Sequence, residues 1–312
     1  MTGRVARVRT EFLGVNRRNH AYLFAHNPRT RHRLVDDKRA TKTVLAEHGV
    51  PAPALHAVCD APWQIGARLR AQLDGMSEFA LKPARGAGGA GIVVVTGRQG
   101  PAFVRASGAA MTWPDVAAHA ADVVAGVYSA GGLDDALLVE ELVIPEPTLA
   151  ALAHRGVPDL RVLVFRGVPV LAMLRLPTRR SDGRANLHMG GVGVGVALGS
   201  GTTTHGVLGR RPVDIHPDLG TPLAGVVVPA WPEVLAIALR AADAVGLGFL
   251  GVDVVLDARH GPLVLELNAR PGLAIQVANR RGLRPLLEAV ATAAVPVTIE
   301  ERVSFGQRLA EP

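Results

Sequence analysis

Two apolar segments between residues 248 and 273 constrain the fold of this chain more than any other feature. They read FLGVDVVL and LVLELNA, with a turn at residues 258–261 between them, so the pattern predicts an antiparallel β-hairpin. Each segment contains an acid within an otherwise apolar run, Asp253 in the first and Glu266 in the second. Because an unpaired carboxylate is costly to bury, both acids need partners.

Strand pairing brings these acids together. If the turn is 258–261, Asp253 lies directly across from Glu266, and Asn268, two residues further on, points to the same face. Two carboxylates and an amide oxygen are hard donors that suit Mg²⁺. The alternative is that all three are solvated positions on a half-exposed hairpin, and the short motif alone does not decide between the two interpretations.

Composition bounds the class of protein. The chain has 312 residues, of which 48% are apolar and 20% are charged, enough for one large domain or a few small ones. It has no apolar run long enough to cross a bilayer and no apolar stretch behind the basic start, which argues against a membrane span and a secretory signal. A single cysteine, Cys59, is typical of a reducing compartment, so we expect a cytoplasmic protein without a membrane partner.

The formal net charge is +7, and ten lysines and arginines fall within the first 39 residues. Such a balance suits either a nucleic acid or an acidic substrate. Aromatic residues make up only 4% of the chain and do not interleave with the basic ones, unlike in single-strand binders. We therefore favour a solvated arginine-rich surface and expect no nucleic-acid partner.

Further along the chain, helical and strand patterns alternate. The segment DDKRATKTVLAEHGVPAP predicts a helix capped by Asp37 and ended by Gly49 and Pro51. The glycine loop, residues 86–91 (GAGGAG), lies between the apolar segments SEFALKP and IVVVTG. It matches the dinucleotide-binding fingerprint, but that motif opens a helix, and here a β-branched strand follows. Mixed hairpins and helices predict the α+β class.

Charged residues beside these strands add a second hypothesis. Lys82 stands among apolar neighbours just before the glycine loop, so it needs an anionic partner, and a phosphate is a natural one. Glu140 and Glu141 end the strand LLVEEL, where a carboxylate and backbone groups can contact an adenine edge. Asp159 lies downstream and is suited to a ribose hydroxyl. Acidic strand ends are also commonly just solvated, so these signals alone are weak.

The order of these segments resembles the ATP-grasp superfamily. The matching pieces run from DKRATKTVLAEHGVPAP through LKPARGAGGAGI, LVEELV, DLRVLVFRG and GRANLHMGG to GVDVVL and LELNARPGL. The chain is most similar to α-L-glutamate ligases of the ribosomal-protein-modifying type and their homologues. The likeness covers about Asp36 to Leu273. It implies an ATP-grasp fold in which two α+β subdomains clamp the nucleotide. The segments are then a short N-terminal arm (1–35), a central subdomain with the glycine loop (36–145) and a C-terminal subdomain with the metal site (146–312).

The resemblance also implies roles for individual residues. Those that would bind the nucleotide are Lys38, Lys82, Gly86, Gly88, Gly89, Gly91, Glu140, Glu141, Leu142, Asp159 and Arg175. Those that would hold Mg²⁺ are Asp253, Glu266 and Asn268, with Glu266 bridging two ions and Mn²⁺ as an alternative metal. Those that would face the phosphates, the acyl intermediate or a substrate carboxylate are Arg184, Asn186 and Arg270. His188 is as readily structural as a base.

The implied activity is an ATP- and Mg²⁺-dependent ligase that joins a carboxylate substrate to an amine acceptor through an acylphosphate. Glutamate or another amino acid is the added group, and the acceptor is an amino acid, a peptide or a small molecule. The chain departs from the pattern in its short region before Lys38, in Gly251, where some dipeptide-forming members have arginine, and in Met189, where a basic residue is common. A phosphotransferase, a nucleotide-binding module without turnover and a homo-oligomer all stay open.

Overall fold

A computed structural model describes residues 10–86, 88–129 and 132–311. Contacts group the chain into two compact units. Unit 1 comprises Met1–Asp36, Ala40–Ala52 and Ile144–Pro312, and unit 2 comprises Asp37–Arg39 and Pro53–Val143. The three-part division with boundaries at 35 and 145 stays a prediction.

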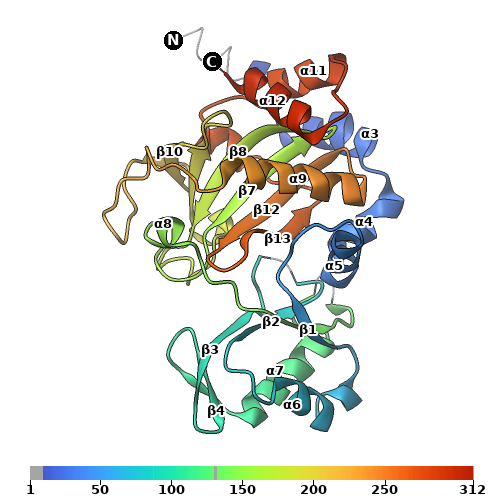
Figure 1. Ribbon diagram of the computed structural model, residues 1–312, viewed down its shortest axis with the longest axis vertical. Coiled ribbons are helices and arrows are strands. Elements are labelled where there is room, and N and C mark those ends of the chain that lie inside the picture. The colour runs from blue at the N-terminus through green and yellow to red at the C-terminus, as the bar shows by residue number, and fades with distance from the viewer. Residues whose placement is uncertain (1–9, 87, 130–131, 312) are drawn as a thin grey trace. The chain divides into compact units, whose positions relative to one another are not determined.

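Unit 2 is a six-stranded antiparallel sheet with helices on one face (Figure 1). Its strands follow the order β1-β6-β2-β3-β4-β5. The elements are β1 (Leu55–Cys59), η2 (Pro62–Gln64), α6 (Ala67–Leu73), β2 (Phe79–Pro83), β3 (Val93–Gln99), β4 (Ala102–Arg105), β5 (Ala110–Met111), α7 (Trp113–Val124) and β6 (Leu137–Glu140). Phe79, Leu81 and Val95 are fully buried against apolar residues of α6 and α7, which form the core of this unit.

Unit 1 is built on a seven-stranded antiparallel sheet of order β11-β10-β9-β8-β7-β12-β13. Its strands are β7 (Asp159–Phe165), β8 (Val168–Leu176), β9 (Val192–Val196), β10 (Thr203–Leu208), β11 (Arg211–Val213), β12 (Phe249–Asp257) and β13 (Gly261–Asn268). Its helices are α2 (Val15–Arg17), the π-helix η1 (Arg18–Leu23), α3 (Phe24–His26), α4 (Arg29–Asp36), α8 (Pro147–Ala150), the 3₁₀ turn η4 (Leu187–Met189), α9 (Trp231–Val245), α10 (Ala274–Ala278), α11 (Arg284–Thr292) and α12 (Ile299–Ala310). With two sheets and many helices, the predicted α+β class is confirmed.

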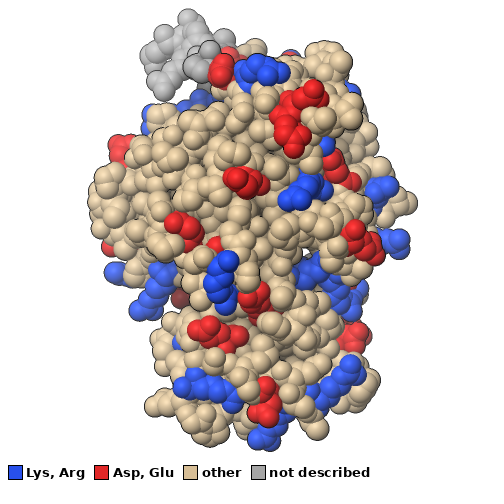
Figure 2. Space-filling model, in the orientation of Figure 1, with Lys and Arg blue, Asp and Glu red and all other residues tan. Residues whose placement is uncertain are grey.

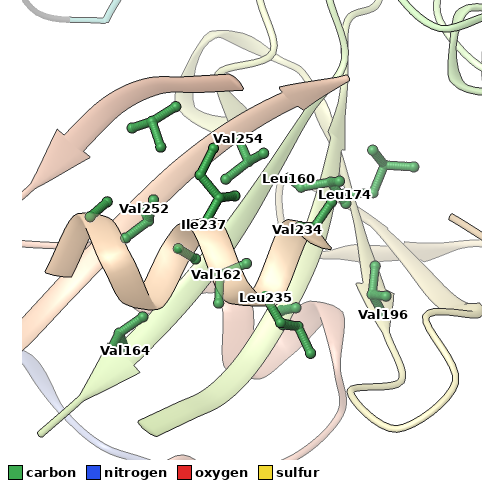
Figure 3. Close-up of a cluster of buried hydrophobic side chains, with 14 of the residues drawn as sticks. Leu160, Val162, Val164, Leu174, Val196, Val234, Leu235, Ile237, Val252 and Val254 are labelled. Carbon is green, nitrogen blue, oxygen red and sulfur yellow. The ribbon is translucent and has the colours of Figure 1, made fainter. Parts of the chain in front are cut away.

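The sheet of unit 1 has two different faces because side chains alternate along each strand. On β7 and β12, Val162 and Val252 belong to the face that packs against α9 (Figure 3). Leu163 and Phe165 belong to the opposite face, where they join a cluster with residues of α10 and α11. Asp159 and Arg161 follow the same alternation and therefore lie on this second face, at the start of β7. The second face is thus apolar at one end and charged at the other.

The predicted hairpin is β12 and β13, and Asp253 does pair with Glu266. The predicted turn was wrong, however. Asp257 pairs with Gly261, so only residues 258–260 form the turn, and the register shifts by one residue between Asp253 and Val254. This β-bulge compensates for the shorter turn. The predicted pairing of Asp253 with Glu266 is therefore confirmed, because the shorter turn and the β-bulge offset one another.

The predicted helix and glycine loop are also present. Helix α5 (Lys38–Glu47) begins directly after Asp37, whose carboxylate accepts the backbone N–H of Arg39 at 2.9 Å, as expected of an N-cap. Strands β2 and β3 are antiparallel, and the glycine loop connects them, with Ala87 outside the described residues. A strand rather than a helix follows the loop, which confirms that it is not the dinucleotide-binding fingerprint.

The N-terminal segment is part of the fold of unit 1. Tyr22 packs edge-on against Phe165, with ring centroids 5.5 Å apart. Asn27 is buried, and its amide N–H groups donate to the carbonyls of Phe249 at 2.8 Å and Ala269 at 3.1 Å, while its oxygen accepts the N–H of Phe249 at 2.8 Å. One side chain therefore joins the segment to the backbone of both β12 and the end of β13.

On the face shown in Figure 2, lysine and arginine side chains are interspersed with aspartate and glutamate side chains. In the part of the chain that the structure describes, no helix combines the length and the apolar character that crossing a bilayer demands.

We expect Asn27→Ala to lower the free energy of unfolding by about 1–3 kcal/mol, because it leaves a buried N–H and two carbonyls without this partner. Urea unfolding would measure the loss, with Asn16→Ala on the exposed side of α2 as the control. Equal unfolding midpoints for the two variants would show that the Asn27 contacts do not hold the segment in place.

Candidate functional site

Asp253 is the centre of the charged end of the sheet face. It is 1% exposed. Arg161, directly opposite on β7, donates from Nε and Nη2 to its two carboxylate oxygens, each at 2.6 Å. Arg175 of β8 donates from Nη2 at 2.6 Å, and the Asn268 amide from Nδ2 at 3.2 Å. Strand pairing therefore places two arginines against Asp253, and their charges offset the cost of burying its carboxylate.

Arg175 also donates from Nε to Asp159, its partner across β7 and β8. Burial, with a further contribution from Asp253, raises the pKa of Asp159 to about 6 even though Arg175 acts in the opposite direction. Burial acts the same way on Asp253, but Arg161 and Arg175 outweigh it and lower the pKa of that carboxyl. Burial disfavours the charged form of Arg175, but the carboxylates of Asp159 and Asp253 outweigh this effect and raise the pKa of Arg175. Of the two carboxyl groups, Asp253 therefore loses its proton at the lower pH.

The other two predicted metal ligands lie beside Asp253. Glu266 lies directly opposite on β13 and is half-buried, and Asn268 pairs with Gly251 and reaches Asp253. Over the described ranges of the chain, no group of three or more His, Cys, Asp or Glu side chains is arranged to hold a metal ion. A metal held here would therefore depend on the Asn268 oxygen as a third protein ligand, a donor that suits Mg²⁺.

Arg161 is a site residue that the sequence-based assignment missed. It lies within the segment DLRVLVFRG that carries the resemblance, two residues after Asp159 and so on the same strand face. That spacing was a usable signal. What the sequence could not show is that Asp253 stands directly across from it in β12.

The loop before β9 positions other predicted residues. The side chain of Asn186 accepts the backbone N–H of His188 at 2.9 Å and its carbonyl accepts the N–H of Gly191 at 3.0 Å. Asn186 thus caps the turn η4. His188 is exposed and Arg184 is half-buried. The roles of Arg184 and Asn186 toward phosphates or an acyl intermediate stay predictions.

In unit 2, Lys82 has the anionic partner that its apolar surroundings require. Its Nζ lies 2.6 Å from a carboxylate oxygen of Glu140, which is 2% exposed on the neighbouring strand β6. The role of Glu140 as a nucleotide contact stays a prediction. Glu141 and Leu142 follow β6 and are half-buried, and the N–H of Glu141 donates to the carbonyl of Ala54.

Lys38 contacts the glycine loop. Its Nζ donates to the carbonyl of Gly86 at 2.8 Å, and its backbone N–H donates to Ala84. Gly91 has φ +70°, and a Cβ there would lie 2.6 Å from the ring of Tyr128, so only glycine fits. Gly88 and Gly89 also have positive φ angles.

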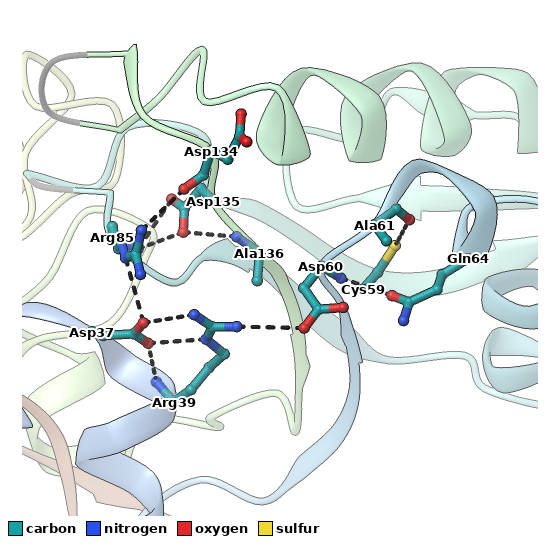
Figure 4. A network of polar contacts seen from close by, with 10 residues as sticks. All are labelled: Asp37, Arg39, Cys59, Asp60, Ala61, Gln64, Arg85, Asp134, Asp135 and Ala136. Atoms are coloured by element: carbon teal, nitrogen blue, oxygen red, sulfur yellow. Dashed lines mark hydrogen bonds and ion pairs between the residues drawn. The ribbon is translucent and has the colours of Figure 1, made fainter.

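A network of charges holds the start of this loop (Figure 4). The backbone N–H of Arg85 lies 3.0 Å from both oxygens of the buried Asp135 carboxylate, and its side chain lies 3.4 Å from Asp37. Asp37 in turn binds Arg39. The same carboxylate that caps α5 therefore also contacts the residue that precedes Gly86.

The raised pKa of Asp159 has a consequence for stability. Because the folded pKa of about 6 exceeds the ordinary value of 3.8, ionisation of Asp159 opposes folding. The stability that the protonated Asp159 contributes is fully present below about pH 4 and is lost as the pH rises through about 6. Asp159→Asn stays neutral. As the pH rises from about 4 to about 6, we therefore expect the free energy of unfolding of Asp159→Asn to increase relative to that of the parent.

Carboxyl ¹³C chemical shifts measured against pH, with urea unfolding at about pH 4 and 7, would check this. A titration of Asp159 near its ordinary pKa, or parallel pH profiles for the two proteins, would contradict the expectation.

Two curated relatives are similar to parts of this chain. The probable α-L-glutamate ligase of Maridesulfovibrio salexigens is 30% identical over 142 residues, which are 46% of this chain and 33% of that protein. The probable α-L-glutamate ligase of Sodalis glossinidius (strain morsitans) is 27% identical over 237 residues, which are 76% of this chain and 57% of that protein. The chain therefore spans between a third and just over half of the length of these relatives.

Among solved structures, the ATP-grasp ligase PsnB complexed with a minimal precursor is similar to this chain. It has 16% sequence identity and a TM-score of 0.46, and the match covers 85% of this chain and 63% of PsnB.

The chain also matches the model of a protein family. The family model described as sugar-transfer associated ATP-grasp matches residues 17–292, which include both sheets, the glycine loop and the β12–β13 hairpin. The resemblance that the sequence motifs indicated is confirmed over most of the chain, and the chain belongs to the sugar-transfer associated ATP-grasp family.

Proposed function

We propose that this chain is an ATP-dependent ligase that joins a carboxylate to an amine through an acylphosphate. The observation that carries the proposal is the set of facing residues in unit 1, Asp253, Glu266 and Asn268, on a face that also holds Arg161 and Arg175. The names of the curated relatives support glutamate or another amino acid as the added group.

The reaction has two steps. A substrate carboxylate oxygen attacks the γ-phosphorus of ATP, the bond from that phosphorus to the bridging oxygen breaks, and ADP leaves. An amine then attacks the acyl carbon, phosphate leaves, and the nitrogen loses a proton as the amide forms. Both steps need positioned cations more than a nucleophilic side chain. We assign part of that task to Arg175, which also binds Asp159 and Asp253.

Asp253, Glu266 and Asn268 would hold Mg²⁺, with Mn²⁺ as an alternative, and Glu266 would be the ligand shared by a second ion. The residues fit because all three offer oxygen donors from adjacent strand positions. When bound, Mg²⁺ would neutralise charge on the phosphates. Arg161 and Arg175 keep Asp253 ionised and fix the orientation of its carboxylate.

The remaining residues have roles in nucleotide binding. In unit 2, we assign Lys38 and Lys82 to the phosphates, the glycine loop to covering them, and Glu141 and Leu142 to adenine. Glu140 holds Lys82 in place through their ion pair. In unit 1, Asp159 would bind a ribose hydroxyl and Arg175 a phosphate.

Glu266→Gln is the sharpest test of this proposal. It removes one carboxylate of the metal set but keeps Asp253 and its two arginines, whereas Asp253→Asn would leave two buried guanidinium groups facing a neutral amide. With Mg²⁺, ATP and pools of amino acids and peptides, we expect ADP release to fall by about 100-fold or more. Glu233→Gln, on the exposed side of α9, is the matched control and should keep the parent rate.

Mass spectrometry of the product separates the alternatives. An amide formed together with ADP is the expected result. A stable phosphoester would indicate a phosphotransferase instead. Thermal stabilisation by ATP without any ADP would indicate a binding module. Equal rates for Glu266→Gln and Glu233→Gln would show that the assigned metal residues are wrong.

A further inference from the structure

Three consecutive residues after β13 are each held by the N-terminal segment. The carbonyl of Ala269 accepts a hydrogen bond from Asn27 at 3.1 Å. The guanidinium of Arg270 lies 3.2 Å from Nδ1 of His32. The carbonyl of Pro271 accepts a hydrogen bond from Nη1 of Arg18 at 2.8 Å. The exit of the hairpin and the N-terminal segment therefore form one local structure within unit 1.

Arg18 is held in this place by the unusual helix that it begins. In η1 the backbone N–H of Phe24 donates to the carbonyl five positions earlier, that of Asn19, the spacing of a π-helix, which is rare and frequent at functional sites. The side chain of Asn19 accepts from Arg18 Nε at 3.1 Å and Nη2 at 2.8 Å. These contacts orient the guanidinium toward Pro271 and leave it partly buried.

Arg18 and Arg270 bring like charges together. Burial lowers the pKa of Arg18, and the charge of Arg270 lowers it further. Within residues 10–86, 88–129 and 132–311, neither guanidinium has a carboxylate at ion-pair distance. The partner of Arg270 is instead a ring nitrogen, Nδ1 of His32. The buried arginines of the sheet face differ, since Arg161 and Arg175 each bind an aspartate.

This cluster lies close to the candidate metal residues. A Cβ added to Gly251 would come within 2.8 Å of Pro271 Cβ and within 3.6 Å of both Arg161 Nε and Asn268 Cβ. Gly251 pairs with Asn268 and is two residues from Asp253. The residue that Arg18 binds through its carbonyl therefore packs directly over the strand that carries Asp253.

We propose that Arg18, Arg270 and His32 form a binding site for an oxyanion group of the substrate, a carboxylate or a phosphoryl group. The Arg270 guanidinium offers paired N–H donors that match either oxyanion. Arg18 donates from Nε and Nη2 to Asn19 and from Nη1 to Pro271, which leaves one further N–H on each of Nη1 and Nη2. A bound anion would relieve the repulsion between the two guanidinium groups. The contact with the His32 ring orients the Arg270 guanidinium. The assignment of this anion to the ligase substrate rests on the proposed function, whereas the anion site itself does not.

The site can be tested without nucleotide or turnover. Glutarate and inorganic phosphate would be titrated at constant ionic strength, with chloride as the reference, and apparent Kd values taken from the shift in thermal midpoint. We expect one of the two anions to stabilise the parent protein more than chloride does. Arg270→Gln, an exposed position, should weaken that binding about tenfold or more, and Arg211→Gln, exposed on β11, should leave it unchanged.

Arg18→Lys provides a second variant that keeps the charge but loses the paired donors. It should weaken anion binding in the same direction while preserving the positive charge at this position. Tighter glutarate binding identifies a carboxylate, and tighter phosphate binding identifies a phosphoryl group. No stabilisation beyond chloride, or equal affinities for the parent, Arg270→Gln and Arg18→Lys, would overturn the site.

ADP release separates this inference from the proposed function. If the parent binds the anion but produces no ADP with any substrate pool, the proposed function fails and the anion site stands. If the parent produces ADP and an amide while the variants bind anions as the parent does, the anion site fails and the ligase stands.

Discussion

The buried carboxylate of Asp253 and its two arginines are the interaction on which the rest of unit 1 depends. A charge that is 1% exposed is tolerated only with close counter-charges, and these come from strands β7 and β8. The three strands must therefore pair in one register, because a slip of one residue would move the charges to the α9 face. The strand register that forms the sheet is thus also the register that brings the two arginines to Asp253.

The N-terminal segment extends this constraint beyond the sheet. Asn27 joins the segment to β12 and to the end of β13, and Tyr22 packs on Phe165 of β7. The segment thereby fixes the residues that follow the β12–β13 hairpin, including Arg270. A short arm before α5 is in this way a structural part of the charged end of unit 1.

The sequence predicted the β12–β13 hairpin and the position of the glycine loop well. Two short apolar runs, each with one acid, located the hairpin, and counting from the turn between them placed Asp253 opposite Glu266, because these are local properties of the sequence. The turn was misplaced because a bulge is not visible in the residue pattern, and the pairing survived because the bulge offset the shorter turn. The glycine loop was recognised correctly because a β-branched strand follows it.

What could not be predicted were partners distant in sequence. Glu140 pairs with Lys82 across 58 positions, and Arg161 with Asp253 across 92. Strand order in the sheet decides such contacts, and the residue pattern of a single sequence does not reveal that order. The same holds for Arg18, whose contact with Pro271 spans 253 positions and depends on how the π-helix and Asn27 place the segment.

We propose that the charged face of unit 1 holds the metal of a nucleotide complex. The most direct measurement is paramagnetic broadening by Mn²⁺ with a non-hydrolysable ATP analogue, in protein labelled with ¹³C at the aspartate and glutamate carboxyl groups. The account predicts strong, nucleotide-dependent broadening of Asp253 and Glu266, with Asp243 of α9 little affected. Sharp resonances for Asp253 and Glu266 under conditions in which the nucleotide binds would contradict it.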